Sequence, residues 1–275
     1  MKLLAVLGNP IAHSKSPLMH NALYDRLGID AIYTRRLIAN GERLREDFDA
    51  LGVAAANITV PFKEFAFAQA DEVRGDAAAI GAVNTWVRED GRLIGYNTDS
   101  AGFWQAIAHF DTPTNALILG AGGTARAVAV GFAKARENGQ VRGECIVLNR
   151  SADRLAFFAD RGIKTASWDH LIDQPFDLII NTTSAGLKSD DLPLEVAALS
   201  RYLAAARYAV DVIYGRETPF LRLAHEMGKT VQDGEAMLVA QGALAHKLFF
   251  PDTSADFAAI ARIMQTALRL PTQWR

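Results

Sequence analysis

The chain has 275 residues, of which 50% are hydrophobic and 22% are charged, as is ordinary for a globular protein. Its formal net charge is −2 and it has no long block of lysine or arginine, so we expect no nucleic-acid partner and no binding to an anionic membrane. A single cysteine, Cys145, excludes a disulfide framework, and the six histidines lack metal-ligand spacing, so we expect no metal site.

Predicted strands and helices alternate in the first part of the chain. The apolar run Leu3–Leu7 ends at Gly8-Asn9-Pro10, too early for a signal peptide, and no run approaches the length of a membrane span, so we expect a cytoplasmic protein. The apolar pattern predicts strands at 3–7, 31–37, 54–59 and 82–87, and helices at 17–27, 41–51 and 61–69. Residues 1–100 are therefore expected to form an α/β domain with a mainly parallel sheet.

A second alternating series follows. Strands are predicted at 117–119, 145–148, 178–181, 208–212 and 230–231, and helices at 100–109, 124–135, 235–249 and 255–268. Residues 101–235 are expected to form a nucleotide-binding domain of the Rossmann type. The helices of segment 236–275 are expected to complete the first domain. The predicted fold class is thus α/β, with two domains separated by a cleft.

The segment Ala116-Leu-Ile-Leu-Gly-Ala-Gly-Gly-Thr-Ala-Arg126 has the pattern of a dinucleotide-binding loop. Glycines let the backbone turn tightly and approach phosphates, while the N–H groups and dipole of the following helix face the negative charge. The pattern G-x-G-G-x-A departs from the standard G-x-G-x-x-G, but the strand before it and the helix after it supply the required context. The residues predicted to bind the cofactor here are Gly120, Ala121, Gly122, Gly123 and Thr124.

The end of the next strand indicates which nicotinamide cofactor is used. In this fold an acidic residue at that point bonds the ribose 2′-hydroxyl of NAD, whereas an arginine accommodates the 2′-phosphate of NADP. Here the strand Cys145–Leu148 is followed by Asn149, Arg150 and Ser151, with Arg154 close behind. We therefore expect NADP as the cofactor. The alternative is a solvated turn with two surface arginines.

Lys63 and Asp99 are the candidate reacting pair. Pro61 is predicted to open a helix capped by Thr59 or Val60, which places Lys63 in the first helical turn, where the dipole disfavours a cation. A lysine in that position suits a proton donor or acceptor, although a surface lysine is the alternative. Asp99 precedes a helix and is either its N-cap or a partner for Lys63, and the two roles are compatible.

Further motifs of polar residues, glycine and proline are spread over most of the chain. They are, in order, Ser14-Lys-Ser16-Pro17, Asn57-Ile-Thr59-Val-Pro-Phe-Lys63, Gly81-Ala-Val-Asn84-Thr85, Tyr96-Asn97-Thr98-Asp99, Gly120-Ala-Gly-Gly-Thr-Ala-Arg126, Asn149-Arg150-Ser151, Asn181-Thr-Thr-Ser-Ala-Gly186, Asp211-Val-Ile-Tyr214 and Met237-Leu-Val-Ala-Gln241-Gly242. This series resembles that of the shikimate dehydrogenases. The chain departs from it at Thr124, at Ser151 and in a short segment, Leu187–Leu194.

The resemblance implies a reversible, NADP-dependent reduction of 3-dehydroshikimate to shikimate by a monomer or homodimer. It implies that Lys63 is the general acid and base and that Asp99 orients it. It assigns the substrate carboxylate to Ser14, Ser16 and Tyr214, and the ring hydroxyls to Asn57, Thr59, Asn84, Asp99 and Gln241, with Lys63 also in contact. Ile213 and Gly234 are expected to flank the nicotinamide.

Several of these residues have simpler explanations. Ser14 and Ser16 are candidate caps for the helix that opens at Pro17, and Asn84 is a candidate to satisfy a strand end. Gln241 needs a partner on an apolar helix stripe, either substrate or backbone, and Tyr214 alone would suit packing. Two alternatives remain for the function: a quinate/shikimate dehydrogenase with relaxed cofactor use, and a non-catalytic NADP-binding regulatory module.

Overall fold

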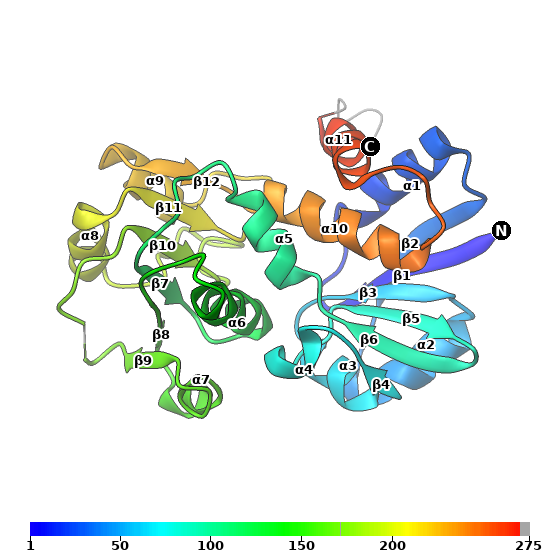
Figure 1. Ribbon diagram of the computed structural model, residues 1–275, viewed down its shortest axis with the longest axis horizontal. Coiled ribbons are helices and arrows are strands. Elements are labelled where there is room, and N and C mark those ends of the chain that lie inside the picture. Colours follow the sequence, from blue (N-terminus) through cyan, green and yellow to red (C-terminus); the bar gives the residue numbers. More distant parts are fainter. Residues whose placement is uncertain (171, 270–275) are drawn as a thin grey trace. The chain divides into compact units, whose positions relative to one another are not determined.

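The computed structural model describes residues 1–170 and 172–269. The chain divides into two compact units, which are described separately (Figure 1). The first unit comprises Met1–Phe103 and Leu238–Arg275, of which 270–275 lie outside the described residues. The second unit comprises Trp104–Met237.

The first unit is built on a six-stranded sheet with the order β2-β1-β3-β5-β6-β4. β1, β2 and β3 are parallel, β5 runs antiparallel to β3 and β6, and β4 is parallel to β6. Asp90 and Gly91, both with positive φ, join β5 to β6 in a tight hairpin. The strands are β1 Lys2–Gly8, β2 Ala31–Leu37, β3 Ala55–Ile58, β4 Glu72–Val73, β5 Thr85–Glu89 and β6 Arg92–Tyr96.

Helices cover both faces of this sheet. Successive strand residues point to opposite faces, so Leu4 and Val6 join one core while Ala5 and Leu7 join the other. The first core is completed by α1 (Ser16–Leu27), α10 (Glu235–Phe249) and α11 (Phe257–Leu268), which lie together in Figure 1. The second is completed by α2 (Leu44–Leu51), α3 (Lys63–Gln69) and α4 (Ala77–Ile80), with a 3₁₀ turn, η1, at Gly41–Arg43. α5 (Asp99–Ala106) follows β6.

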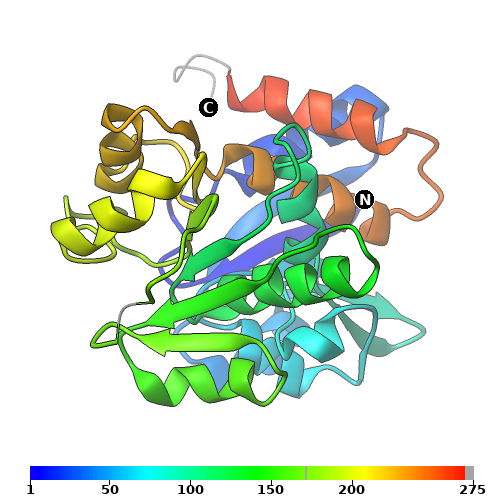
Figure 2. The ribbon, with the colours of Figure 1, turned by 60° about the vertical axis from the view of Figure 1, so that its left-hand side comes forward.

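The second unit has a six-stranded sheet whose pairings are all parallel, seen side by side in Figure 2. Its order, β12-β11-β10-β7-β8-β9, is the Rossmann strand order, and the order in which the chain adds strands reverses between β7 and β10. In such sheets ligands bind beyond the carboxyl ends of the strands at that reversal point. The strands are β7 Ala116–Leu119, β8 Cys145–Asn149, β9 Lys164–Ser167, β10 Leu178–Asn181, β11 Tyr208–Asp211 and β12 Thr230–Gln232.

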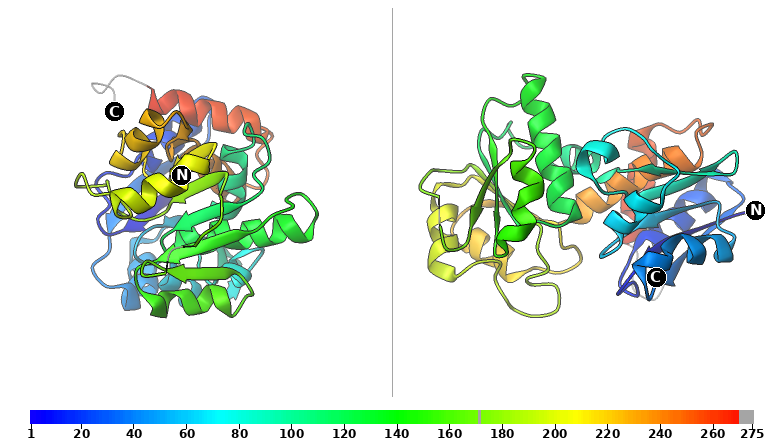
Figure 3. Two further views of the ribbon diagram at one scale, coloured as in Figure 1. Left: turned by 90° about the vertical axis from the view of Figure 1, so that its left-hand side faces the viewer. Right: turned by 90° about the horizontal axis from the view of Figure 1, so that it is seen from below.

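Helices also cover both faces of the second sheet (Figure 3). α8 (Val196–Ala205) and α9 (Pro219–Glu226) share a core with Leu117, Leu119 and Ile179. The intervening strand residue Ile118 is equally buried, and the long helix α6 (Gly123–Glu137) lies on that side. The remaining helical segments are η2 (Ala152–Leu155) and α7 (Ala156–Ala159).

The predicted α/β class is confirmed, and most predicted elements lie within a few residues of their expected positions. β4, β6, β9 and the helices α4, α7, α8 and α9 were not predicted. The prediction that Pro61 opens a helix is wrong. α3 begins at Lys63 after Phe62, because the residues before it form a turn in which the Phe62 N–H donates to the Thr59 carbonyl oxygen at 3.0 Å.

Candidate functional site

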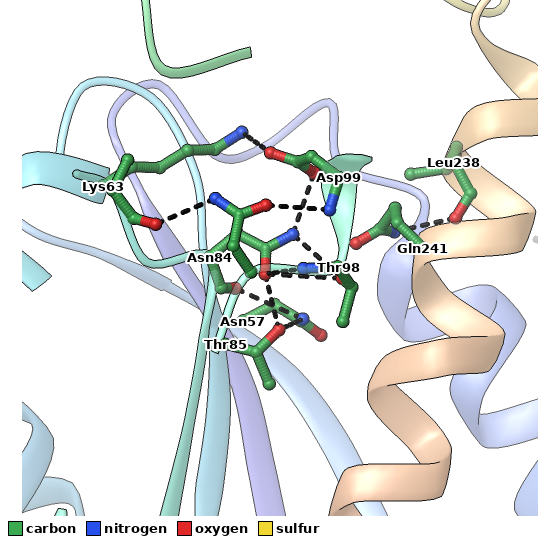
Figure 4. Close-up of polar contacts among 10 residues, drawn as sticks. Asn57, Lys63, Asn84, Thr85, Thr98, Asp99, Leu238 and Gln241 are labelled. Atoms are coloured by element: carbon green, nitrogen blue, oxygen red, sulfur yellow. Dashed lines mark hydrogen bonds and ion pairs between the residues drawn. The ribbon is translucent and has the colours of Figure 1, made fainter. Parts of the chain in front are cut away.

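In the first unit, Lys63 and Asp99 form a buried ion pair (Figure 4). Lys63 is the first residue of α3 and Asp99 is the first residue of α5. The Lys63 Nζ lies 2.6 Å from Asp99 Oδ2, and the two side chains are only 11% and 7% exposed. The helix dipole disfavours a cation at the start of α3, so the carboxylate supplies the compensating charge.

Asn84 fixes the other carboxylate oxygen. Its Nδ2 donates to Asp99 Oδ1 at 2.8 Å and to Thr98 Oγ1 at 2.9 Å. Its Oδ1 accepts from the Thr98 backbone N–H at 2.9 Å. The prediction that Asp99 precedes the helix as its N-cap is wrong, because Asp99 is already the first residue of α5, and both of its carboxylate oxygens bond side chains. Asn84 bonds the β6–α5 segment rather than merely a strand end.

Asn57, at the end of β3, lies in the same hydrogen-bonded group. Its Nδ2 donates to Thr85 Oγ1 at 3.0 Å, and its Oδ1 accepts from the Tyr33 hydroxyl at 2.6 Å. Thr85 Oγ1 in turn donates to Asn84 Oδ1 at 2.8 Å. Tyr33 and Thr85 were not among the residues selected from the sequence. The position of Thr85 within the motif Gly81-Ala-Val-Asn84-Thr85 was the available signal.

Gln241 lies beside α5. A Cβ added at Gly102, one turn after Asp99, would lie 2.9 Å from the backbone nitrogen of Gln241, so glycine is needed where α5 and α10 meet. The Gln241 Nε2 donates to the Leu238 carbonyl oxygen at 2.7 Å. Of the two partners expected for Gln241, substrate or backbone, the backbone is the one observed. Figure 4 shows Gln241 at the edge of the hydrogen-bonded residues around Asp99.

Ser14 and Ser16 are buried and contact each other. Their Oγ atoms lie 3.3 Å apart, and the Ser16 N–H lies 3.4 Å from Ser14 Oγ. The cap residue of α1 is Lys15, without a side-chain cap bond, but Ser14 Oγ accepts from the N–H of Ser16, the first residue of α1, so Ser14 satisfies one donor at the helix start. Thr59 is half-buried just after β3, and its methyl group contacts the position where Gly8 would carry a Cβ.

In the second unit, the predicted glycine loop joins β7 to α6 at the reversal point of the sheet. Gly120 has φ of +108°, and a Cβ there would lie 2.7 Å from Thr182 Oγ1, which follows β10. Gly122 is the cap residue of α6, and a Cβ added there would meet nothing within 4 Å. The helix therefore begins at an open backbone surface, as a pyrophosphate site requires.

The residues predicted to select NADP lie just after β8. Asn149 ends the strand, and its Nδ2 donates to the Ser151 carbonyl oxygen at 2.9 Å, which shapes the turn. The Arg150 guanidinium lies 5.7 Å from the ring centre of Trp168, which follows β9. Arg154 lies in η2 and is exposed. The two guanidiniums are thus carried by consecutive segments at the carboxyl end of the sheet.

A buried carboxylate to which the sequence analysis gave no role, Asp211 of the motif Asp211-Val-Ile-Tyr214, joins the ends of β10 and β11. It accepts hydrogen bonds from Asn181 Nδ2 at 3.0 Å, from Thr218 Oγ1 at 2.7 Å and from the Ile213 N–H at 3.0 Å. Burial raises the pKa of Asp211 to about 6, because the donors that favour its charged form only partly offset desolvation. Asp211 thereby holds the loop that carries Ile213 and Tyr214.

Gly234 bonds the same loop. Its N–H donates to the Ile213 carbonyl oxygen at 2.9 Å, and a Cβ at 234 would collide with the backbone of Val212. The absence of a side chain at this position is therefore already required by packing within the unit.

Among the described residues, no helix is both long enough and apolar enough to cross a bilayer.

The first unit thus presents a lysine that can transfer a proton, next to neutral hydrogen-bonding groups. The second presents a glycine loop, an open helix start and arginines at the adjoining strand end. This combination suits a redox reaction in which a small polar substrate exchanges a hydride with a dinucleotide and a proton with lysine.

Comparison with known proteins identifies close relatives. Residues 6–86 match the family model described as "Shikimate dehydrogenase substrate binding domain". Shikimate dehydrogenase (NADP(+)) from Helicobacter hepaticus is 44% identical over 89% of this chain and 90% of its own length. The enzyme of the same name from Helicobacter pylori strain J99 is 40% identical over 97% and 98%.

Solved structures give the same result. Shikimate dehydrogenase from Aquifex aeolicus superposes with a TM-score of 0.84 and 33% identity, over 98% of each chain. Shikimate 5-dehydrogenase from Thermus thermophilus, solved in complex with NADP(H) and shikimate, has a TM-score of 0.80 and 36% identity over 97% of this chain and 100% of its own.

Proposed function

Because this chain belongs to the shikimate dehydrogenase family, we propose that it catalyses the reversible, NADP-dependent reduction of 3-dehydroshikimate to shikimate, a step toward the aromatic amino acids. It is an oxidoreductase acting on a CH–OH group. The observation that carries the proposal is the buried pair of Lys63 and Asp99, held at 2.6 Å. A protein that only bound the nucleotide would not need this pair.

The Lys63 ammonium donates the proton in the reduction. When bound, NADPH supplies the hydride that reduces the ring ketone. Lys63 stabilises the negative charge that develops on the oxygen and protonates it, and in the reverse direction it accepts that proton. Asp99 holds the ammonium through Oδ2, while Asn84 fixes Asp99 through Oδ1.

The substrate is assigned to residues of the first unit, with Tyr214 of the second unit as the one addition. The buried hydroxyls of Ser14 and Ser16, together with Tyr214, are assigned to its carboxylate. The ring hydroxyls are assigned to residues that can donate and accept hydrogen bonds. These are Asn57, Thr59, Lys63, Asn84, Asp99 and Gln241.

The second unit is assigned to NADP, and its residues fit that group. The open start of α6 and the lack of any atom near the Gly122 Cβ position suit the pyrophosphate. Ala121, Gly123 and Thr124 complete this loop, while Asn149, Arg150, Ser151 and Arg154 would hold the 2′-phosphate. Ile213 and Gly234 would lie against the nicotinamide.

We further infer that the enzyme works in the cytoplasm as a monomer or homodimer, without a nucleic-acid or membrane partner. A small metabolite as substrate and a formal charge of −2 support this view.

The proposal is tested by initial rates with shikimate and with quinate, each with NADP and with NAD. The expected result is the highest kcat/KM for shikimate with NADP. A preference for quinate with NAD would contradict the assignment, and no turnover with any pair would favour a regulatory module. The names of the relatives and the buried Lys63–Asp99 pair do not favour either alternative.

A further inference from the structure

We propose that Tyr33 and Thr85 are positioning residues, whose hydroxyls lock the Asn57 amide in one orientation and link it to Asn84, Asp99 and Lys63. This proposal rests on the proposed function, because it concerns the site assigned there to the substrate. Neither residue is part of the assigned substrate contacts. Both are almost completely buried, with 2% exposure for Tyr33 and 0% for Thr85.

A backbone N–H determines the orientation of the Asn84 side-chain amide. The N–H of Thr98 can only donate, so the atom of Asn84 that lies 2.9 Å from it must be the oxygen, Oδ1. Thr85 Oγ1 lies 2.8 Å from the same oxygen and must place its single proton there. Its oxygen is then left to accept.

The hydrogen bond with Thr85 determines the orientation of the Asn57 amide. Because the Thr85 oxygen accepts, the atom of Asn57 that lies 3.0 Å away must be the amide nitrogen, Nδ2. The two residues are direct neighbours on the paired strands β3 and β5, and Figure 4 shows Thr85 next to both amides. Asn57 Oδ1 then points to the Tyr33 hydroxyl, which donates at 2.6 Å.

Between Tyr33 and Asp99, each side chain donates to the next one in the same direction. Tyr33 donates to Asn57, Asn57 to Thr85, Thr85 to Asn84 and Asn84 to Asp99, while Lys63 donates to Asp99 from the other side. Hydrogen bonds in such a chain polarise and strengthen one another. Every side chain of this hydrogen-bonded chain from Tyr33 to Asp99 is buried, which limits competition from water.

The order of donors also fixes how Asn57 can meet a ligand. Its two amide protons point to Thr85 Oγ1 and to the Asn84 carbonyl oxygen, at 3.0 and 3.4 Å. Its Oδ1 accepts one bond from Tyr33 and keeps one lone pair. Asn57 therefore selects a hydrogen-bond donor, such as a ring hydroxyl, over an acceptor.

Tyr33 is itself held rigidly. His20 stacks on its ring, with centroids 4.3 Å apart and an angle of 3° between the planes. Burial lowers the pKa of His20 to about 3, so that the imidazole is neutral, and burial raises the pKa of Tyr33, so that its hydroxyl keeps the donated proton. Tyr24 also packs against His20. Its hydroxyl lies 3.2 Å from His20 Nδ1 and makes no bond to Asn57.

The test compares Tyr33→Phe with Tyr24→Phe, and Thr85→Val with Thr85→Ser, in the shikimate assay with NADP. Each phenylalanine variant removes one buried hydroxyl from the same cluster, but only Tyr33 bonds Asn57. Loss of one buried neutral hydrogen bond should raise KM for shikimate about fivefold in Tyr33→Phe and Thr85→Val. KM for NADP should stay within about twofold, while Tyr24→Phe and Thr85→Ser should retain wild-type KM for both ligands within about twofold.

Thermal unfolding of all four variants separates positioning from stability. A lowered Tm with unchanged KM in Tyr33→Phe and Thr85→Val would overturn the proposal, as would equal effects of Tyr33→Phe and Tyr24→Phe. Failure of Thr85→Ser to restore KM would also overturn it. A wild-type enzyme without shikimate turnover would instead contradict the proposed function.

Discussion

The two units each bury a carboxylate near the carboxyl end of a strand, but they surround it differently. Asp99 in the first unit pairs with the Lys63 ammonium and accepts a further bond from Asn84. Asp211 in the second unit accepts bonds from Asn181, Thr218 and a backbone N–H, all of them neutral. Both side chains are shielded from solvent.

This difference in surroundings suits Asp99 to a role in the reaction and Asp211 to a role in holding the loop after β11. A carboxylate beside a lysine can hold an ammonium in place for proton transfer. A carboxylate that meets only neutral donors remains poorly solvated, and its pKa rises to about 6 for that reason. Substitutions in the first group should therefore change turnover or the KM for shikimate, whereas those in the second should change stability or cofactor binding.

The largest expected effect is that of Lys63→Ala. Removal of the proton donor should lower kcat by about a hundredfold or more, with little change in KM for either ligand. Steady-state rates measure this. Lys164→Ala is a matched control, because Lys164 forms an exposed ion pair with Glu144 at 2.9 Å and should keep wild-type kcat. Near-normal turnover of Lys63→Ala would remove the distinction drawn between the two carboxylates.

The next effect concerns the pH dependence of stability at Asp211. Its pKa in the folded chain, about 6, lies above its ordinary value of 3.8, so the stability that the protonated form contributes is present below about pH 4 and is lost as pH rises through 6. Relative to Asp211→Asn, the wild-type free energy of unfolding should fall by about 2 kcal/mol between pH 4 and pH 7.

Urea unfolding at several pH values measures the Asp211 effect. His20 and His246 also titrate with lowered pKa values, but they are present in both proteins and cancel in the difference. A difference that stays constant from pH 4 to pH 7 would contradict a raised pKa and would make the two carboxylates alike.

Arg150→Ala should have a smaller effect, confined to the cofactor. Loss of a charge-assisted contact should raise KM for NADP about tenfold, and KM for NAD by less than about twofold. Arg136→Ala provides the control, since Arg136 is exposed in the last turn of α6. Equal effects on NADP and NAD would refute contact with the 2′-phosphate.

The smallest effect on stability is expected for Gly122→Ala. The added Cβ meets nothing within 4 Å, so the free energy of unfolding should change by no more than about 0.5 kcal/mol while the NADP KM rises. Gly120→Ala should destabilise more, because Gly120 has φ of +108° and faces Thr182. Denaturation curves of both variants test this, and unchanged NADP binding in Gly122→Ala would argue against close approach of a phosphate.

The sequence was sufficient for the fold class and the family. Apolar periodicity located most strands of both sheets, and the resemblance to shikimate dehydrogenases is confirmed by the relatives. The hairpin of β5 and β6 was missed although Asp90-Gly91 is a typical turn signal, because Arg92–Tyr96 is a short run that follows directly on the previous strand.

The hydrogen-bonded group around Asp99 required the structure. Thr85 lies opposite Asn57 only because β5 pairs antiparallel with β3, a register that local pattern does not reveal. Tyr33 is on β2, separated from β3 by β1, and its hydroxyl reaches Asn57 across that strand. The selection of individual ligand residues therefore remains a prediction that the kinetic experiments test.

The discontinuity of the first unit has a consequence for the order in which the protein is made. The chain leaves this unit at Phe103 and returns at Leu238, and the core on one face of its sheet combines Met19 and Leu23 with Ile260 and Met264. During synthesis the second unit is complete before the last helices of the first emerge. Until α11 is synthesised, the apolar face of α1 that packs against it stays exposed. Proteolysis of ribosome-bound chains of increasing length should show the second unit becoming protected before the first.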